Sequence, residues 1–303
     1  SPHDVQERVE FPTTTPAETI GKCVQWLRTR HYDALGIASF GPVDLKYCSP
    51  SYGHITTTPK PGWQWTNILR PLRAVQPAAP VGFDTDVNAP ALAEFQHMRR
   101  AGGSQRSCAY VTVGTGIGVG LVINGQPVSG LMHPEGGHVC APCGKFDEGF
   151  KGSHPTGDTF GGMSTENMCC SLALAMRAGL SSTAELAALS DDHPVWDAAA
   201  HHLGALCANI VLMVSPERIV LSGGVMQRAS LFPRVRTAMQ RHLHGYLQLP
   251  QLTTQAGVDA FVTPSTWGND AGLVGALTLA EHALLEKRGG GPFGAALATR
   301  LSW

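Results

Sequence analysis

The stretch that decides the fold is residues 108–125, CAYVTVGTGIGVGLVING. Apolar residues flank a run of alternating glycines from Gly114 to Gly120, and a second turn follows at Asn124-Gly125. This pattern predicts a strand, a glycine-rich turn and a second strand. A turn stripped of side chains lets backbone N–H groups and the Thr115 hydroxyl approach a phosphate closely, although an ordinary glycine-rich hairpin explains the run equally well.

The glycine run differs from the two best-known nucleotide-binding patterns. A dinucleotide fingerprint requires its third glycine at position 119, where this chain has valine, and a helix afterwards. A Walker-type loop ends in Gly-Lys-Ser/Thr, and the run from Gly114 does not. If the run binds phosphate, it does so as the turn of a hairpin.

Alternating helices and strands are predicted on both sides of this hairpin. Upstream lie a helix over 16–31, a buried strand over 34–39, a loop whose Trp63 and Trp65 look exposed, and a second strand, PVGFDTDV. The segment 88–103 follows as a helix closed by a glycine pair. Downstream, helices are expected around 165–178, 194–214, 229–242 and 269–288, with a strand at RIVLSGG. The chain is therefore of the α/β class.

Length and charge narrow the class of protein. With 303 residues the chain is long enough for two lobes, and we expect a smaller N-terminal α/β lobe over 1–104 and a larger one over 105–303, the last helix packing back near the first lobe. Lys+Arg of 22 against Asp+Glu of 23 leaves no basic field for nucleic acid. No membrane span, signal peptide or disulfide framework is expected, which favours a cytoplasmic, reducing location.

Two further segments carry candidate chemistry. Asp84-Thr-Asp86-Val-Asn88 stands at a strand end before a helix, where a carboxylate can act as a base in phosphoryl transfer or can simply cap the helix. Leu221-Ser-Gly-Gly-Val-Met226 runs from a strand into a glycine pair, which allows a flat ring such as adenine to lie against backbone. A tight βα turn is the alternative there.

The order of these motifs is more specific than any one of them. FGPVD, TPKPGW, TDVNA, VGTGIGVGLV, HPEGGH, LSGGVM and WGNDAG occur between Phe11 and about Leu285 in the order and spacing of the ROK family of sugar kinases. Within that family the chain most resembles the bacterial-type fructokinases. The resemblance implies an actin-like ATPase fold with two ribonuclease-H-like lobes and an active site in the cleft between them.

The resemblance also implies roles for individual residues. Asp86 matches the catalytic base, although the family commonly has Asn where Thr85 stands. The expected sugar-binding residues are Gly41, Pro42, Asn88, Glu135 and His138. The expected ATP-binding residues are Gly114, Thr115, Gly116, Gly223, Gly224 and Met226.

The chain departs from the family in two places. Its start resembles only the second strand of the family's opening hairpin, so Val9–Phe11 is expected as a strand, and the first strand with its phosphate loop is not expected in this chain. In the family, His138 would ligate a structural zinc, but Ser153, Thr156 and Thr159 stand at the other ligand positions and Gly161 at a sugar-contacting Glu. Hydroxyls are poor zinc ligands, so we expect no zinc. A substitute site of His138, Cys140, Cys143 and His154 is the alternative.

These features lead to two hypotheses from different classes. The first is an ATP- and Mg²⁺-dependent hexose kinase, with fructose as the foremost substrate and a homodimeric assembly. The second is a pseudokinase that keeps the fold as a sugar-binding or assembly subunit. Beyond the small-molecule sugar and ATP, neither nucleic acid nor membrane is expected as a partner, and a repressor of the same family is disfavoured because no helix-turn-helix precedes the kinase motifs.

Overall fold

A computed structural model describes residues 4–154 and 163–289, and the chain forms two compact units. Unit 1 consists of Ser1–Ala93, Pro127–His133 and Asp270–Trp303, and unit 2 of Glu94–Gln126 and Pro134–Asn269. This division differs from the one expected from the sequence. The first boundary falls at Ala93 rather than at residue 104, and both a short central segment and the C-terminal segment join the first unit.

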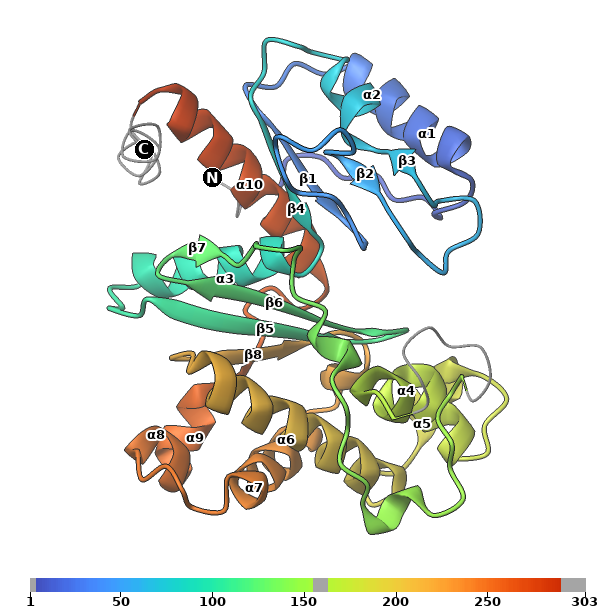
Figure 1. Cartoon of the computed structure of the whole chain (residues 1–303), viewed down its shortest axis with the longest axis vertical. Helices are drawn as coiled ribbons and strands as arrows, with labels where there is room; N and C mark the ends of the chain where they lie inside the picture. Colours follow the sequence, from blue (N-terminus) through green and yellow to red (C-terminus); the bar gives the residue numbers. More distant parts are fainter. Residues whose placement is uncertain (1–3, 155–162, 290–303) are drawn as a thin grey trace. The chain divides into compact units, whose positions relative to one another are not determined.

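A two-stranded parallel sheet forms the centre of unit 1. Strands β1 (Leu35–Ser39) and β4 (Val81–Thr85) pair in register, Leu35 opposite Val81. Helix α10 (Ala271–Lys287) packs directly on both strands (Figure 1). The approach is close because glycines face the helix: a Cβ on Gly36 would lie 1.7 Å from the carbonyl oxygen of Ala276, which no side chain could tolerate.

Two helices and a small hairpin complete unit 1. Helices α1 (Pro16–Arg28) and α2 (Leu69–Arg73) pack around a core of Ile37, Leu69 and Leu72. As the sequence predicts, Thr15 caps α1 by accepting a hydrogen bond from the N–H of Glu18. Strands β2 (His54–Ile55) and β3 (Thr66–Asn67) are antiparallel, and Trp63 between them is 1 % exposed. The expectation of an exposed Trp63 was wrong, because its indole fills a second small core with Val43 and Ile55.

Unit 2 is built on a five-stranded sheet of order β7-β6-β5-β8-β9. Its bounds are Gln126–Pro127 for β7, Ile117–Ile123 for β6, Ser107–Val113 for β5, Ile219–Ser222 for β8 and Val262–Pro264 for β9. Strands β5 and β6 form the antiparallel hairpin predicted around the glycine run, whereas β8 and β9 continue the sheet in parallel. The carboxyl ends of β5 and β8 therefore meet at one edge, where the glycine-rich turns lie.

The helices of unit 2 include both predicted and unpredicted elements. Helix α3 (Asn88–Arg100) begins in unit 1, and the others are α4 (Thr165–Cys169), α5 (Ser171–Arg177), α6 (Val195–Val214), α7 (Leu231–Leu243), α8 (Pro250–Thr253) and α9 (Gln255–Phe261). The short elements α8, α9 and β9 were not predicted, because a few residues carry too little periodicity. Helix α6 is long and apolar enough to cross a membrane, but 67 % of its apolar window is buried and it packs along α7 as a core helix.

The strand expected at Val9–Phe11 is not formed. The described residues from Asp4 to Thr15 contain no strand, and Val9 is 49 % exposed. A strand requires backbone hydrogen bonds to a neighbouring strand, and an apolar alternation alone does not supply them. This segment is held instead by side chains, of which Arg8 pairs with Glu10 and Asp270.

Candidate active site

In the turn from β4 into α3, polar groups form hydrogen bonds within the protein, while the side chain of Asp86 is exposed. The Thr85 hydroxyl accepts the N–H of Asn88 at 3.0 Å, so the helix start is capped by Thr85 and not by Asp86. The backbone N–H of Asp86 donates to the carbonyl of Ser39 at 2.8 Å, which ties the turn to the end of β1. The Asp86 carboxylate itself remains solvent-accessible.

Asp84 is the buried carboxyl of this turn, and the sequence analysis assigned it no separate role. Its Oδ1 accepts hydrogen bonds from the Thr85 N–H at 2.7 Å and from Nδ2 of Asn88 at 3.0 Å. Burial raises the pKa of Asp84 to about 6, and these hydrogen bonds oppose the rise only in part. Nδ2 of Asn88 also donates to the carbonyl of Val128 at 3.2 Å, so the orientation of this predicted sugar-binding amide is set on two sides.

Asp86 has the properties of a general base. Desolvation raises the pKa of its carboxyl, and the ammonium of Lys60 opposes that rise. The side chain is reachable by solvent although protein atoms crowd it. Lys60 belongs to the TPKPGW motif, and its Nζ stands 4.1 Å from the centre of the Phe40 ring. Lys60 was therefore part of a recognised motif, but the sequence analysis gave it no role.

Gly41 and Pro42 lie against a histidine that the sequence analysis did not select. Nε2 of His133 accepts the N–H of Val43 at 3.1 Å, and a Cβ on Gly41 would approach the His133 ring to 3.1 Å. The Gly41–Pro42 peptide is cis. His133 opens the HPEGGH motif and is its only residue in unit 1, to which the predicted sugar-binding pair Gly41 and Pro42 also belongs.

Glu135 and His138, the third and last residues of HPEGGH, belong to unit 2. Nε2 of His138 lies 3.9 Å from Oε2 of Glu135. The two glycines between them press against β6: a Cβ on Gly137 would lie 1.7 Å from the carbonyl oxygen of Ile117. The motif thus needs its glycines for packing, while its acid and its imidazole are placed side by side.

The predicted phosphate loop is the turn between β5 and β6. The N–H of Gly114 donates to the carbonyl of Gly116 at 2.9 Å, and the N–H of Ser171 donates to the carbonyl of Gly114 at 2.8 Å. The Thr115 side chain is exposed at the tip. Oε2 of Glu166 accepts the N–H of Ile117 at 2.7 Å, which brings a carboxylate beside the loop.

A pocket of about 690 Å³ opens beside this loop within unit 2. Gly114, Thr115 and Gly224 line it as predicted, together with Trp196, Leu186, Val225 and a polar rim that includes Ser171, Thr183, Gln227 and Ser230. The volume lies within the usual range for small-molecule and cofactor sites, and glycine backbone borders it at both β5 and β8. The arrangement suits a nucleotide, with phosphates at the β5–β6 turn.

The other predicted ATP-binding residues support the pocket without lining it. Gly223 has φ +92°, and a Cβ there would lie 2.4 Å from the carbonyl oxygen of Val113, so only glycine lets the β8 turn approach β5. Met226 is buried beneath the turn. Gly116 faces the Glu166 carboxylate.

One wall of the pocket is held by Arg228, which sequence reasoning missed. Its guanidinium donates to the carbonyls of Leu186 and Leu189 at 3.2 and 2.9 Å and pairs with Asp191. It also stacks 4.2 Å from the ring centre of Trp196. The arginine therefore fastens the segment 183–191 to the turn after β8. No local pattern marks such a residue, because all its partners are remote in sequence.

Comparison with known proteins agrees with this architecture. A family model described as ROK matches residues 3–283. The chain belongs to the ROK family. It is 37 % identical over 279 residues to a putative fructokinase of Bacillus subtilis, covering 92 % of this chain and 88 % of that protein. It is 34 % identical over 280 residues to a fructokinase of Pediococcus pentosaceus, covering 92 % and 91 %. ROK membership and this level of identity identify the chain as a sugar kinase of the family.

Solved structures confirm the actin-like ATPase fold. A ROK hexokinase from Thermus thermophilus has a TM-score of 0.68 at 25 % identity, covering 93 % of this chain and 91 % of that one. A ROK glucokinase from Streptomyces griseus, in complex with glucose and AMPPNP, has a TM-score of 0.65 at 21 % identity, covering 88 % of each chain. The predicted family and fold class are thereby confirmed.

The residues of this ROK chain do not fit the zinc site of the family. The Ser153 hydroxyl is buried and donates to Oδ1 of Asn167 at 2.9 Å, and that oxygen also accepts the N–H of His154 at 3.0 Å. A hydrogen-bonded cluster thus holds the segment at Ser153. Thr156, Thr159 and Gly161 lie outside the described residues. His138, Cys140, Cys143 and His154, which are described, form no group of three ligands close enough to share an ion.

A different set of potential ligands gathers at Asp147, His201 and His202. Oδ1 of Asp147 already accepts hydrogen bonds from Nη2 of Arg177 at 2.6 Å and from Nε2 of His202 at 2.9 Å. Burial lowers the pKa of His202 to about 4, so the ring is neutral, and the Arg177 guanidinium neutralises the carboxylate. We interpret the group as a buried ion pair, since a metal ion would have to displace or adjoin a fixed cation.

Proposed function

We propose that this ROK protein transfers the γ-phosphoryl group of ATP to a hydroxyl of a hexose, with fructose as the foremost substrate. The observation that carries the proposal is the turn after β4, where Asp84, Thr85 and Asn88 hydrogen-bond to one another while Asp86 remains exposed. The nucleotide-sized pocket beside Gly114 supports the same conclusion. The fructokinases at 34–37 % identity support fructose as the sugar.

The reaction needs a base and a set of sugar contacts. Asp86 accepts the proton of the attacking hydroxyl as the new O–P bond forms and the bond from the γ-phosphorus to the β–γ bridging oxygen breaks, which releases ADP. The proposed sugar-contacting residues are Gly41, Pro42, Asn88, Glu135 and His138. Desolvation raises the pKa of Asp86, which favours proton uptake by its carboxylate.

The phosphates need donors and countercharge. The backbone N–H groups of Thr115 and Gly116 and the Thr115 hydroxyl are the proposed donors, since the Gly114 N–H is bonded within the turn. Mg²⁺, when bound, neutralises charge on the phosphates. Glu166 fits such an ion, because among the described residues the Ile117 N–H bonds to its Oε2 only, and carboxylate oxygen is a preferred Mg²⁺ ligand.

A coupled assay of ADP release tests this function. We expect turnover with ATP and Mg²⁺, and a higher kcat/KM for fructose than for mannose or glucose. A preference for glucose would contradict the proposed sugar while leaving the kinase intact. Absence of turnover with every sugar, while calorimetry still shows sugar binding, would instead favour the pseudokinase hypothesis.

A further inference from the structure

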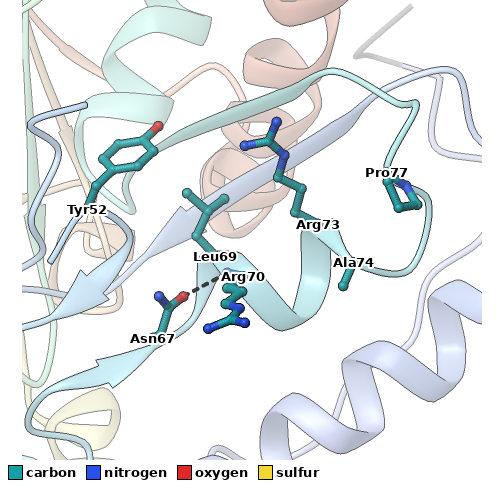
Figure 2. Close-up of a pocket in the computed structure, with 7 residues that line it drawn as sticks. All are labelled: Tyr52, Asn67, Leu69, Arg70, Arg73, Ala74 and Pro77. Carbon is teal, nitrogen blue, oxygen red and sulfur yellow. Dashed lines mark hydrogen bonds between the residues drawn. The ribbon is translucent and has the colours of Figure 1, made fainter. Parts of the chain in front are cut away.

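A second pocket, of about 360 Å³, lies in unit 1 on the surface of α2 (Figure 2). Its polar lining consists of Tyr52, Asn67, Arg70 and Arg73, and its apolar lining includes Leu69 and Pro77. It contains none of the residues proposed above for sugar, ATP or catalysis. Its chemistry therefore requires a separate explanation.

The two arginines of this pocket differ from six others in the described part of the chain. Arg8, Arg30, Arg177, Arg228, Arg234 and Arg236 each pair with a carboxylate. Within the described residues, the side chains of Arg70 and Arg73 have neither a carboxylate nor a carbonyl partner, and both residues are exposed. The lining of the pocket thus carries two positive charges and no negative one.

Tyr52 adds a third donor at the same end as Arg73. Figure 2 shows the Tyr52 hydroxyl and the Arg73 guanidinium turned toward one end of the pocket, with Arg70 and Asn67 at the other. Burial raises the pKa of the Tyr52 phenol, and the charge of Arg73 opposes that rise, so the hydroxyl stays protonated and can donate. Oδ1 of Asn67 accepts the N–H of Arg70 at 2.7 Å, which fixes its amide.

We propose that this pocket binds the phosphate monoester of a small polyol, such as a sugar phosphate. A guanidinium beside a hydroxyl donor suits a phosphate dianion, because both supply N–H or O–H groups and no competing acceptor. The phosphate lies at the Arg73 and Tyr52 end, the ligand's hydroxyls reach Asn67 and Arg70, and its carbon skeleton packs on Leu69 and Pro77. Sugar phosphates are also the product class of the proposed function, but the binding site does not depend on that function.

The pocket is also in contact with β4, the strand that leads into the turn of the candidate base Asp86. The Tyr52 ring packs edge-on against Phe83 of β4, with ring centres 6.2 Å apart at 86°. Phe83 immediately precedes Asp84, and Leu69 beneath the pocket belongs to the same core as β1. A ligand on Tyr52 therefore lies one side chain away from the catalytic strand.

Isothermal titration calorimetry tests the proposal on the whole chain. Fructose 6-phosphate, inorganic phosphate and fructose are titrated separately in the presence of saturating AMPPNP, which fills the phosphate loop. We expect fructose 6-phosphate to bind more tightly than inorganic phosphate, and to bind about tenfold more weakly to the R70M/R73M double variant. Raising the salt concentration from 50 to 500 mM should weaken that binding in the wild type, because exposed charges are screened.

Two controls make the result decisive. R28M/R241M removes the same charge from the last turns of α1 and α7, outside the pocket, and should bind fructose 6-phosphate like the wild type. Tyr52→Phe keeps the packing on Phe83 and should weaken binding about threefold by removing one donor. Unchanged affinity in R70M/R73M would overturn the site. Equal affinity for inorganic phosphate would overturn the assignment to a polyol ester.

Discussion

The turn after β4 is shaped by polar side chains, whereas the turn between β5 and β6 is shaped by backbone and lacks most side chains. At the first, Asp84, Thr85 and Asn88 are buried side chains that hydrogen-bond to one another and leave Asp86 accessible. At the second, Gly114 and Gly116 remove side chains, and the loop is shaped by backbone hydrogen bonds. Proton transfer needs a carboxylate of controlled pKa, whereas phosphate binding needs N–H groups that no side chain obstructs. Activity should therefore depend on the side chains of the first turn itself. At the second turn it should depend on the residues that pack beside the loop.

Replacing the base should produce the largest effect. We expect Asp86→Asn to lower kcat by about a thousandfold, because an amide cannot accept the hydroxyl proton in a preorganised site. Sugar binding should survive, since the amide fills the same space. Coupled-assay kinetics and calorimetry measure the two quantities, with Asp192→Asn, on a 98 % exposed carboxylate, as the control. A variant that keeps a tenth of the wild-type rate would rule out Asp86 as the base.

Asp84, the buried carboxyl beside Asp86, should make the free energy of unfolding depend on pH. The native pKa of Asp84 is about 6 against an ordinary value of 3.8 for an aspartate carboxyl, so the native state holds this proton more tightly than the unfolded state. The free energy of unfolding should therefore fall as pH rises from about 4 to about 6, by up to about 3 kcal/mol. In Asp84→Asn this part of the fall should disappear. Urea unfolding of both proteins between pH 4 and pH 7.5 gives the difference, and parallel curves would contradict it.

Removing Arg228, which holds one wall of the pocket beside the β5–β6 turn, should weaken nucleotide binding. Arg228→Met removes the hydrogen bonds that fasten the 183–191 wall of the pocket, and we expect KM for ATP to rise about 30-fold, or about 2 kcal/mol. KM for the sugar should change little. Arg234→Met, which breaks an ion pair with Asp197 outside the pocket, is the matched control. An equal rise in both variants would show that Arg228 acts only through general stability.

A substitution of Glu166 tests whether its negative charge helps to bind the metal ion or whether it only shapes the loop through its hydrogen bond to Ile117. Glu166→Gln keeps an oxygen for the Ile117 N–H but removes the charge, and we expect the half-saturating Mg²⁺ concentration to rise about fivefold, near 1 kcal/mol. Electron paramagnetic resonance of Mn²⁺ binding with AMPPNP gives a readout independent of turnover. Glu148→Gln, an exposed carboxylate, should change neither quantity. Unchanged Mn²⁺ affinity in Glu166→Gln would remove this residue from the metal's surroundings.

Metal removal should have the smallest effect. Because Asn167 holds Ser153 and His154 through hydrogen bonds, we expect less than one zinc per chain and a Tm unaffected by a chelator. Asn167→Ala should lower the Tm, since it leaves buried donors without an acceptor. Stoichiometric zinc in elemental analysis would instead promote a site at Cys140 and Cys143.

Local patterns were sufficient where the physical cause was local. The cap at Thr15, the β5–β6 hairpin and the long helices followed from short-range periodicity, because each depends on residues within a few positions. Trp63 and Val9 were misjudged because burial and strand pairing depend on distant segments. Arg228 and Lys60 escaped assignment for the same reason, since their partners are remote in sequence or in another motif.

The sequence alone determined the ROK family, the α/β class and the candidates Asp86, Gly114 and Gly223, because ordered motifs and glycines record backbone requirements that no other residue meets. Tertiary structure decided which of those groups are available. It assigned the helix cap to Thr85, buried Asp84, moved Met226 beneath the pocket and brought Arg73 beside Tyr52. Whether a polar group can bind a substrate depends on its desolvation and on the hydrogen-bond partners that tertiary folding places beside it. The spacing of residues along the chain reveals neither.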